Sequence, residues 1–184
     1  NTLSAVIGQA ENSFSPLQMA KYISVLTNGG QNIDLTLIKT IINQDGTEVS
    51  REEINNYVDG KISRTRTNKQ DLNIDSENLK AILEGMRSVA NDPGGTAYDT
   101  FKNFEIEIGG KTGSAEAGNK SNGWFVGFAP FDEPEIAIVV FVEGGEHGSY
   151  TAEVAKDIIS EYFGMNQAKV EENNTINNYT QTIQ

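Results

Sequence analysis

A single lysine stands among small polar residues in the stretch 105–114, and this is where the chain could do chemistry. Lys111 supplies a positive charge, Thr112 and Ser114 supply hydroxyls, and the backbone N–H of Ser114 is a further donor. Glycines beside them, Gly113 among these, leave room for another backbone or a ligand to approach. Such a group suits a carboxylate or a phosphate, so the sequence predicts an anion site here.

A strand is expected to carry this site. Charged and apolar residues alternate over Glu105–Ile108, which predicts a strand that begins before the lysine. The same alternation places Thr112 and Ser114 on one face and Lys111 on the other face or at the rim. A string of Lys-Thr-Gly-Ser is common by chance, and taken alone it is explained more simply by an exposed lysine on an edge strand.

Two further strands are predicted after the lysine. Ser121-Asn122-Gly123 indicates a turn, and a second strand follows it. We expect three adjacent antiparallel strands, because short turns join the second to the third; they cover Phe104–Ser114, Gly123–Ala129 and Glu135–Val142. Trp124 is expected to pack under the sheet rather than touch a ligand, since a lone aromatic in a strand is usually part of the core.

Helices are predicted on both sides of this region. Ser15 and Pro16 open one helix, and Gly29-Gly30 ends it. Asp75-Ser76 opens a second. A last helix is expected to pack on the sheet through Ile158 and Ile159, which share one face with Ala155 and Tyr162. Ile33–Ile42 is β-like, with a hairpin turn at Asp45-Gly46. Ser50–Asp75 is polar and is expected to be a solvated loop, with a basic patch at Lys61, Arg64, Arg66 and Lys69.

The order of these motifs resembles the transpeptidase domain of penicillin-binding proteins. Lys-Thr-Gly-Ser, then Gly-Trp-Phe-Val-Gly-Phe-Ala-Pro, then Ile136–Val142 follow that family's order, and Lys-Thr-Gly is one of its signatures. Gly8-Gln9, Ser15–Ala20 and Pro93–Ala97 also match, and the whole looks most like the class B, monofunctional branch from about Ile7 to Gly164. The resemblance implies an α+β fold with an antiparallel sheet and helices on both faces.

The family's reaction is acyl transfer, in which a serine attacks a carbonyl and backbone N–H groups hold the oxyanion. No lysine of this chain has a serine three residues before it. The one Ser-x-Asn string, Ser76-Glu77-Asn78, lies where helix-capping residues belong, and we read it as a cap. The chain carries the third motif without the first two, so the resemblance implies an incomplete, C-terminal part of the domain, with the nucleophile before Asn1 and no activity in this chain by itself.

By the same resemblance, Lys111 and Ser114 would be catalytic. Lys111 would interact with the absent second-motif serine and with substrate, and the Ser114 N–H would be one oxyanion donor. Thr112 and Ser114 would bind a carboxylate, and Gly113 would keep the strand clear for the acyl chain. The implied function is peptidoglycan D,D-transpeptidation. Two alternatives stay open: a serine β-lactamase or β-lactam sensor domain, which shares the third motif, and a non-catalytic scaffold or binding module.

The composition limits the size of the fold and the kinds of ligand that the chain can bind. The chain has 184 residues, 37% of them hydrophobic, which suffices for one domain and a core. A net charge of −12 argues against nucleic-acid binding and against anionic membrane surfaces. Cysteine is absent, which excludes disulfides, and the single histidine, His147, cannot build a metal site alone. We expect no cofactor, a transpeptidase part over 1–168 and a polar, disordered tail over 169–184.

The resemblance also implies partners and a location. The partners would be peptidoglycan stem peptides, β-lactam antibiotics and a glycosyltransferase. The sequence contains no run of 18 apolar residues. A parent protein would carry an N-terminal membrane anchor outside these residues and would act at the extracytoplasmic face of the bacterial cell membrane.

Overall fold

Three antiparallel strands form the centre of the fold. The computed structural model describes residues 13–61, 70–145 and 148–165, and in it the strands lie in the order β3, β4, β5. They are β3 (Gly109–Ala117), β4 (Lys120–Ala129) and β5 (Ile136–Val142). The predicted sheet is therefore confirmed, including its antiparallel pairing. Among the described residues β3 pairs only with β4, which leaves its other edge open.

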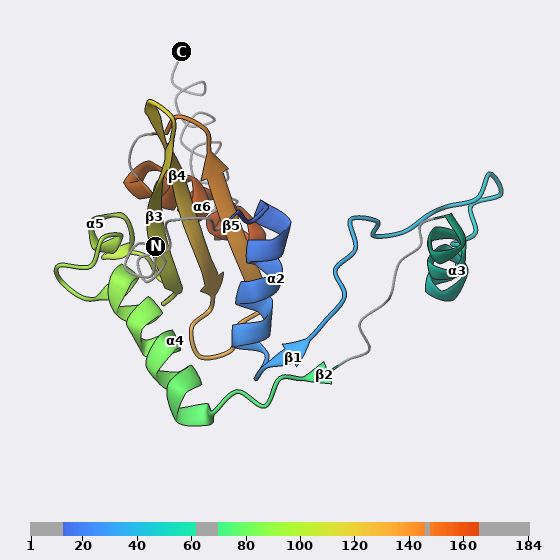
Figure 1. Cartoon of the computed structure of the whole chain (residues 1–184), viewed down its shortest axis with the longest axis horizontal. Coiled ribbons are helices and arrows are strands. Elements are labelled where there is room, and N and C mark those ends of the chain that lie inside the picture. The colour runs from blue at the N-terminus through green and yellow to red at the C-terminus, as the bar shows by residue number, and fades with distance from the viewer. Residues whose placement is uncertain (1–12, 62–69, 146–147, 166–184) are drawn as a thin grey trace, which may run out of the picture.

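Helices cover both faces of this sheet, as expected (Figure 1). On one face α6 (Gly148–Tyr162) packs its Ile159 against a cluster that includes Phe125 and Val140. On the other face α2 (Pro16–Thr27) packs Ile23 against Phe128 and its neighbours. The helix α4 (Ser76–Asn91) lies against β3 and contributes to both clusters, and the short α5 (Tyr98–Phe101) follows it.

The predicted helix boundaries are correct at α2 and α4. Ser15 caps α2 through a reciprocal pair of hydrogen bonds with Gln18, which satisfies backbone N–H groups that the first turn leaves unpaired. At α4 the Asp75 carboxylate accepts the N–H groups of Glu77 and Asn78, at 2.9 and 3.1 Å. Ser76-Glu77-Asn78 is thus a helix start, as the sequence indicated.

An outlying segment differs from its prediction. Part of the expected loop is a helix, α3 (Arg51–Lys61), and the segment joins the body through the pairing of β1 (Gln31–Asn32) with β2 (Gln70–Asp71). The guanidinium of Arg51 donates to the carbonyl oxygens of Ile38 and Lys39, which ties the helix to the preceding irregular stretch. Of the proposed basic patch, Arg64, Arg66 and Lys69 lie outside the described residues.

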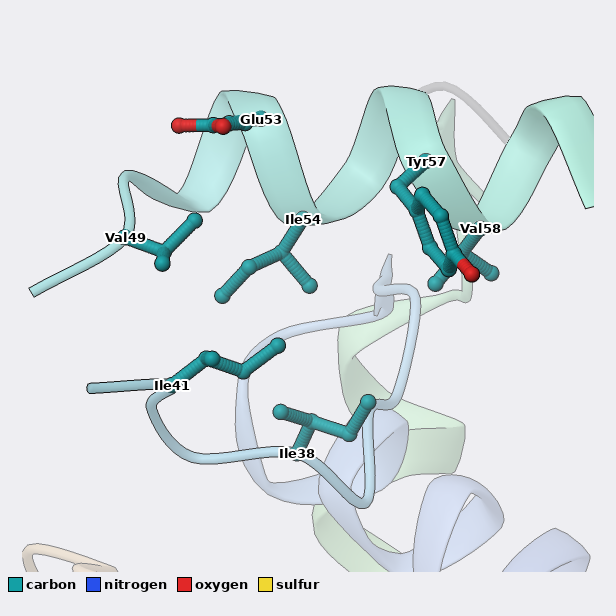
Figure 2. Close-up of a pocket in the computed structure, with 7 residues that line it drawn as sticks. All are labelled: Ile38, Ile41, Val49, Glu53, Ile54, Tyr57 and Val58. Carbon is teal, nitrogen blue, oxygen red and sulfur yellow. The ribbon is translucent and has the colours of Figure 1, made fainter. Parts of the chain in front are cut away.

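A cavity of about 380 Å³ lies between α3 and the irregular stretch that precedes it, 38–49 (Figure 2). The β-like prediction for Ile33–Ile42 is wrong for most of its length, because the stretch makes only one isolated bridge, from Ile42 to Glu48, around the Asp45-Gly46 turn. The side chains that line the cavity are apolar except for one carboxylate: Ile38, Ile41, Val49, Glu53, Ile54, Tyr57 and Val58.

Three local predictions about the sheet need correction. The site strand begins at Gly109, not at Glu105. The first hairpin turns at Gly118-Asn119, where Gly118 has a φ of 62°, so Ser121-Asn122-Gly123 lies within β4. The helix α6 buries Ala155 and Ile159 as predicted, together with Ala152, but Ile158 and Tyr162 of the predicted face are exposed.

The glycines before Lys111 make room for the chain's own aromatic rings. Gly109 lies directly opposite Phe128, and a Cβ at Gly109 would overlap that ring. A Cβ at Gly110 would come within 2.5 Å of the Phe125 ring, which is fully buried. The space that the sequence suggested for a ligand is therefore filled by β4, and the glycines serve the pairing of the two strands.

This fit predicts that Gly110→Ala destabilises the chain. The added methyl group forces a buried ring to move, and such overpacking costs about 1–3 kcal/mol of the free energy of unfolding. Gly85→Ala is the matched control: Gly85 lies within α4 with open space around its Cα, so the same change should stabilise by about 0.5–1 kcal/mol. Urea denaturation of both variants measures the difference. Equal stabilities would contradict the proposed fit.

Candidate functional site

Lys111 is exposed on β3, with its ammonium close to the backbone of its own strand. The ammonium Nζ donates to the carbonyl oxygen of Thr112 at 2.5 Å. Within the described ranges the structure gives Lys111 no carboxylate partner. A cation on an open strand edge can attract an anion, and the anion site at Lys111 stays a prediction.

Thr112 lies on the opposite face of the strand from Lys111. Lys111 pairs with Val126 and Thr112 pairs with Phe125, and these two β4 residues belong to clusters on opposite faces of the sheet. The predicted division of faces therefore agrees with the register. Thr112 is only 9% exposed, and its Oγ1 lies 2.6 Å from the Oγ1 of Thr96. The sequence gives no local sign of this partner, which lies 16 positions earlier in the chain.

Gly113 is in contact with the first residue of α6. A Cβ at Gly148 would lie 2.7 Å from the carbonyl oxygen of Gly113 and 2.9 Å from its nitrogen, so only glycine at position 148 permits this approach. A Cβ at Gly113 itself would meet only Trp124, at an ordinary 3.4 Å. The structure thus requires a glycine at 148 for packing, whereas Gly113 is not required by the described fold.

Ser114 is exposed near the end of the pairing, where it lies opposite Gly123. Trp124, one position further along β4, is half-buried, and its ring centroid lies 4.6 Å from that of Phe141 on β5. Trp124 thus packs on a neighbouring ring, but it belongs to neither core cluster, and Phe141 is itself exposed. His147 lies outside the described residues.

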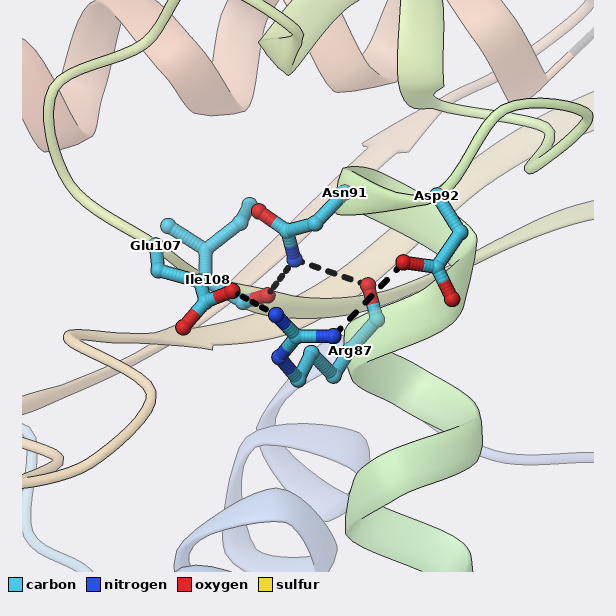
Figure 3. A network of polar contacts seen from close by, with 5 residues as sticks. All are labelled: Arg87, Asn91, Asp92, Glu107 and Ile108. Carbon is cyan, nitrogen blue, oxygen red and sulfur yellow. Dashed lines mark hydrogen bonds and ion pairs between the residues drawn. The ribbon is translucent and has the colours of Figure 1, made fainter.

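A polar network connects α4 to the residues just before β3 (Figure 3). The Nδ2 of Asn91 donates to the carbonyl oxygen of Ile108 at 2.8 Å and to that of Arg87 at 2.7 Å. The Arg87 guanidinium forms an ion pair with Glu107 and lies 3.6 Å from Asp92. These contacts hold the chain three residues before Lys111.

The electrostatics of the network favour the charged guanidinium. The hydrogen bond to the Glu107 carboxylate is the main reason that the pKa of Arg87 is raised above its usual value, and the charges of Glu107 and Asp92 add to it. Neither Arg87 nor Asn91 was identified from the sequence. Both lie in the last turns of an amphipathic helix, where a polar side chain gives no local sign of a distant partner.

Two other features of the described chain lack the groups that a catalytic or metal site needs. The cavity at α3 has a single carboxylate, Glu53, and no cation or hydroxyl pair that could activate a reacting group. Among residues 13–61, 70–145 and 148–165, no three histidine, cysteine or carboxylate side chains come close enough to hold a metal ion. The edge of β3 is therefore the candidate site.

Comparison with known proteins shows the family of the chain. The family model of the penicillin binding protein transpeptidase domain matches residues 1–160. The chain belongs to the penicillin-binding protein transpeptidase family. Penicillin-binding protein H of Bacillus subtilis is 32% identical over 151 residues, which cover 76% of this chain and 20% of that protein. Peptidoglycan D,D-transpeptidase MrdA of Acinetobacter baumannii is 30% identical, covering 85% of this chain and 23% of that protein.

A solved structure supports the same family. The crystal structure of Pseudomonas aeruginosa PBP2 in complex with WCK 5153 superposes with a TM-score of 0.68 at 31% identity, covering 88% of this chain and 32% of that chain. The relatives are of the class B, PBP2 type that the motif order indicated. The chain spans about a fifth to a quarter of the length of the curated relatives that it matches. None of the helices in its described part is both long and apolar enough to cross a membrane.

The network in Figure 3 predicts that Asn91 stabilises the start of β3. Asn91→Ala removes the donor to Ile108, a fully buried residue, and an unpaired buried carbonyl costs about 1–3 kcal/mol. Asn78→Ala, at an exposed position of the same helix, should change the free energy of unfolding by at most about 0.5 kcal/mol. Urea denaturation compares the two; an Asn91→Ala variant as stable as the control would show that this hydrogen bond does not hold the strand.

Proposed function

We propose that this chain is the C-terminal part of a peptidoglycan D,D-transpeptidase, which crosslinks stem peptides through a serine acyl-enzyme. The observation that carries the proposal is Lys111, an exposed cation on an open strand edge with hydroxyls on either side of Gly113. Family membership supports the reaction class, and a relative 30% identical to the chain is named a peptidoglycan D,D-transpeptidase.

The roles of the strand residues follow from what acyl transfer requires. The reaction forms a negative oxygen on the attacked carbonyl, and the N–H of Ser114 is one donor that could hold it. Thr112 and Ser114 offer hydroxyls to the terminal carboxylate of the acyl donor or to the carboxylate of a β-lactam. Lys111 lies one position before Thr112 and three before Ser114, where its charge would stabilise both the substrate and a serine brought to the edge of β3.

The nucleophile must come from outside the chain. An acyl-enzyme needs an activated serine, and no serine here has a lysine three positions after it. The open edge of β3 is the place where a separate element carrying the nucleophile could approach. In this proposal Gly113 keeps that edge clear for the acyl chain, while Gly148 supports it from the α6 side.

Partners and location are proposed on the same basis. Stem peptides and β-lactam antibiotics would occupy the edge of β3, and a glycosyltransferase would supply the glycan strands. The full-length protein would be anchored in the membrane and would act on its extracytoplasmic face. A serine β-lactamase or a β-lactam sensor domain shares the Lys-Thr-Gly motif. Relatives named penicillin-binding proteins and peptidoglycan transpeptidases favour the transpeptidase instead.

In the full-length protein, Lys111→Ala should slow acylation by a β-lactam. A charge-assisted contact is worth about 1.5–3 kcal/mol, so the rate should fall by about tenfold or more. Thr112→Val should have a smaller effect, because it removes a neutral donor. Lys120→Ala, an exposed lysine on the other strand of the same hairpin, is the control and should react as the wild type does. Fluorescent penicillin labelling over time measures all four proteins, and a wild-type rate in Lys111→Ala would remove the lysine from the mechanism.

The 184-residue chain alone should not react with penicillin. Ser114 lies on the strand that carries the binding groups, so it cannot also attack from the opposite side. The oxyanion donor contributed by the nucleophile's own N–H is also absent, and the loss of one such donor costs about 10²–10³ in rate. Incubation with a fluorescent penicillin, followed by intact-mass measurement, tests this. A stoichiometric adduct would show that a serine of this chain is the nucleophile.

A further inference from the structure

The functional roles proposed above do not use the hydrogen bond between the hydroxyls of Thr96 and Thr112. Their oxygens lie 2.6 Å apart, a normal distance for an O–H···O hydrogen bond. Thr112 is 9% exposed and lies within the sheet, whereas Thr96 is exposed in the loop that follows α4. Thr96 therefore contacts Thr112, whose hydroxyl is buried, whereas Ser114 on the same strand is exposed.

The position of Thr96 is set by the tight loop around it. The N–H of Ala97 donates to the carbonyl of Val89 at 3.0 Å, and the N–H of Gly95 donates to the carbonyl of Asp92 at 3.0 Å. A Cβ at Gly95 would lie 2.5 Å from the carbonyl oxygen of Ser88, so the loop can fold onto the end of α4 only with glycine there. These contacts fix the backbone at Thr96, and so they fix where its side chain begins.

The hydrogen bond between the two hydroxyls can run in either direction. Each carries one proton and can accept two hydrogen bonds. If Thr112 donates to Thr96, its only proton is used. If Thr96 donates to Thr112, the Thr112 proton is available to an anion, and a chain of hydrogen bonds of this kind strengthens its last donor. The direction of this one hydrogen bond decides whether Thr112 can bind a carboxylate.

We propose that Thr96 is a positioning residue for carboxylate recognition: it donates to Thr112 when an acyl donor is bound, and so directs the Thr112 proton to the acyl donor's carboxylate. This inference rests on the proposed function and deepens it, since it assigns part of the specificity for a carboxylate to a residue outside the Lys-Thr-Gly-Ser strand. Thr96 itself acts through Thr112.

The test uses the full-length protein and three substitutions at position 96. Thr96→Val keeps the shape and removes the hydroxyl, Thr96→Ser restores it, and Thr96→Ala is a second deletion that does not depend on how a valine packs. Thr100→Val, in the adjacent α5, is the matched control. Labelling by penicillin is measured over a range of concentrations, so that the half-saturating concentration and the limiting acylation rate are obtained separately.

We expect Thr96→Val and Thr96→Ala to raise the half-saturating concentration by about two- to fivefold, within the range of one neutral hydrogen bond and by no more than Thr112→Val does, with a smaller change in the limiting rate. Thr96→Ser and Thr100→Val should behave as the wild type. The defect should disappear when the penicillin is replaced by its methyl ester, which lacks the carboxylate charge. It should also disappear in a Thr112→Val background, because there is then no proton for Thr96 to direct.

A general packing effect would persist with the ester and would add to the Thr112→Val effect, and either result would overturn the inference. So would a wild-type half-saturating concentration in Thr96→Val and Thr96→Ala. These outcomes leave the proposed function intact, because the wild-type protein is still acylated. A wild-type full-length protein that forms no adduct would instead overturn the proposed function, and this inference with it.

Discussion

The pairing of a glycine-rich strand with an aromatic one determines the rest of this structure. Gly109 and Gly110 have no side chains, and the rings of Phe128 and Phe125 lie where those side chains would be. The fit holds β3 in one register against β4. A shift by one residue would move every side chain of β3 to the opposite face of the sheet. The face on which Lys111 lies is therefore a consequence of aromatic packing two residues away.

A second set of contacts holds β3 from the side of α4. Asn91 donates a hydrogen bond to the carbonyl oxygen of Ile108, which precedes Lys111. Thr96 contacts the hydroxyl of Thr112, which follows Lys111. Lys111 is thus held between two points that both come from the end of one helix and its following loop. A site built on a rigid strand loses little conformational entropy when a ligand binds, which favours recognition and rate alike.

Much of this fold could be predicted because its signals are local. Ser15 with Pro16, and the apolar run of β5, lie within a few residues of the structures they specify. The error at Glu105–Ile108 has a tertiary cause: the carbonyl of Glu107 accepts the N–H of Phe131, and that of Ile108 accepts the Asn91 side chain, so these residues alternate like a strand without pairing as one. Ile158 was misplaced because the buried stripe of α6 is centred on Ala152, Ala155 and Ile159, and of these the sequence pattern did not indicate Ala152.

The site shows the same division between local and distant information. Lys111, Thr112 and Ser114 are adjacent in the chain, so their chemistry could be recognised from the sequence. The burial of Thr112 could not, since it depends on a loop 16 residues away that folds onto α4. Every group that holds β3 in place, from Asn91 to Phe128, nevertheless belongs to the described chain. The position of Lys111 on β3 therefore follows from contacts within this chain.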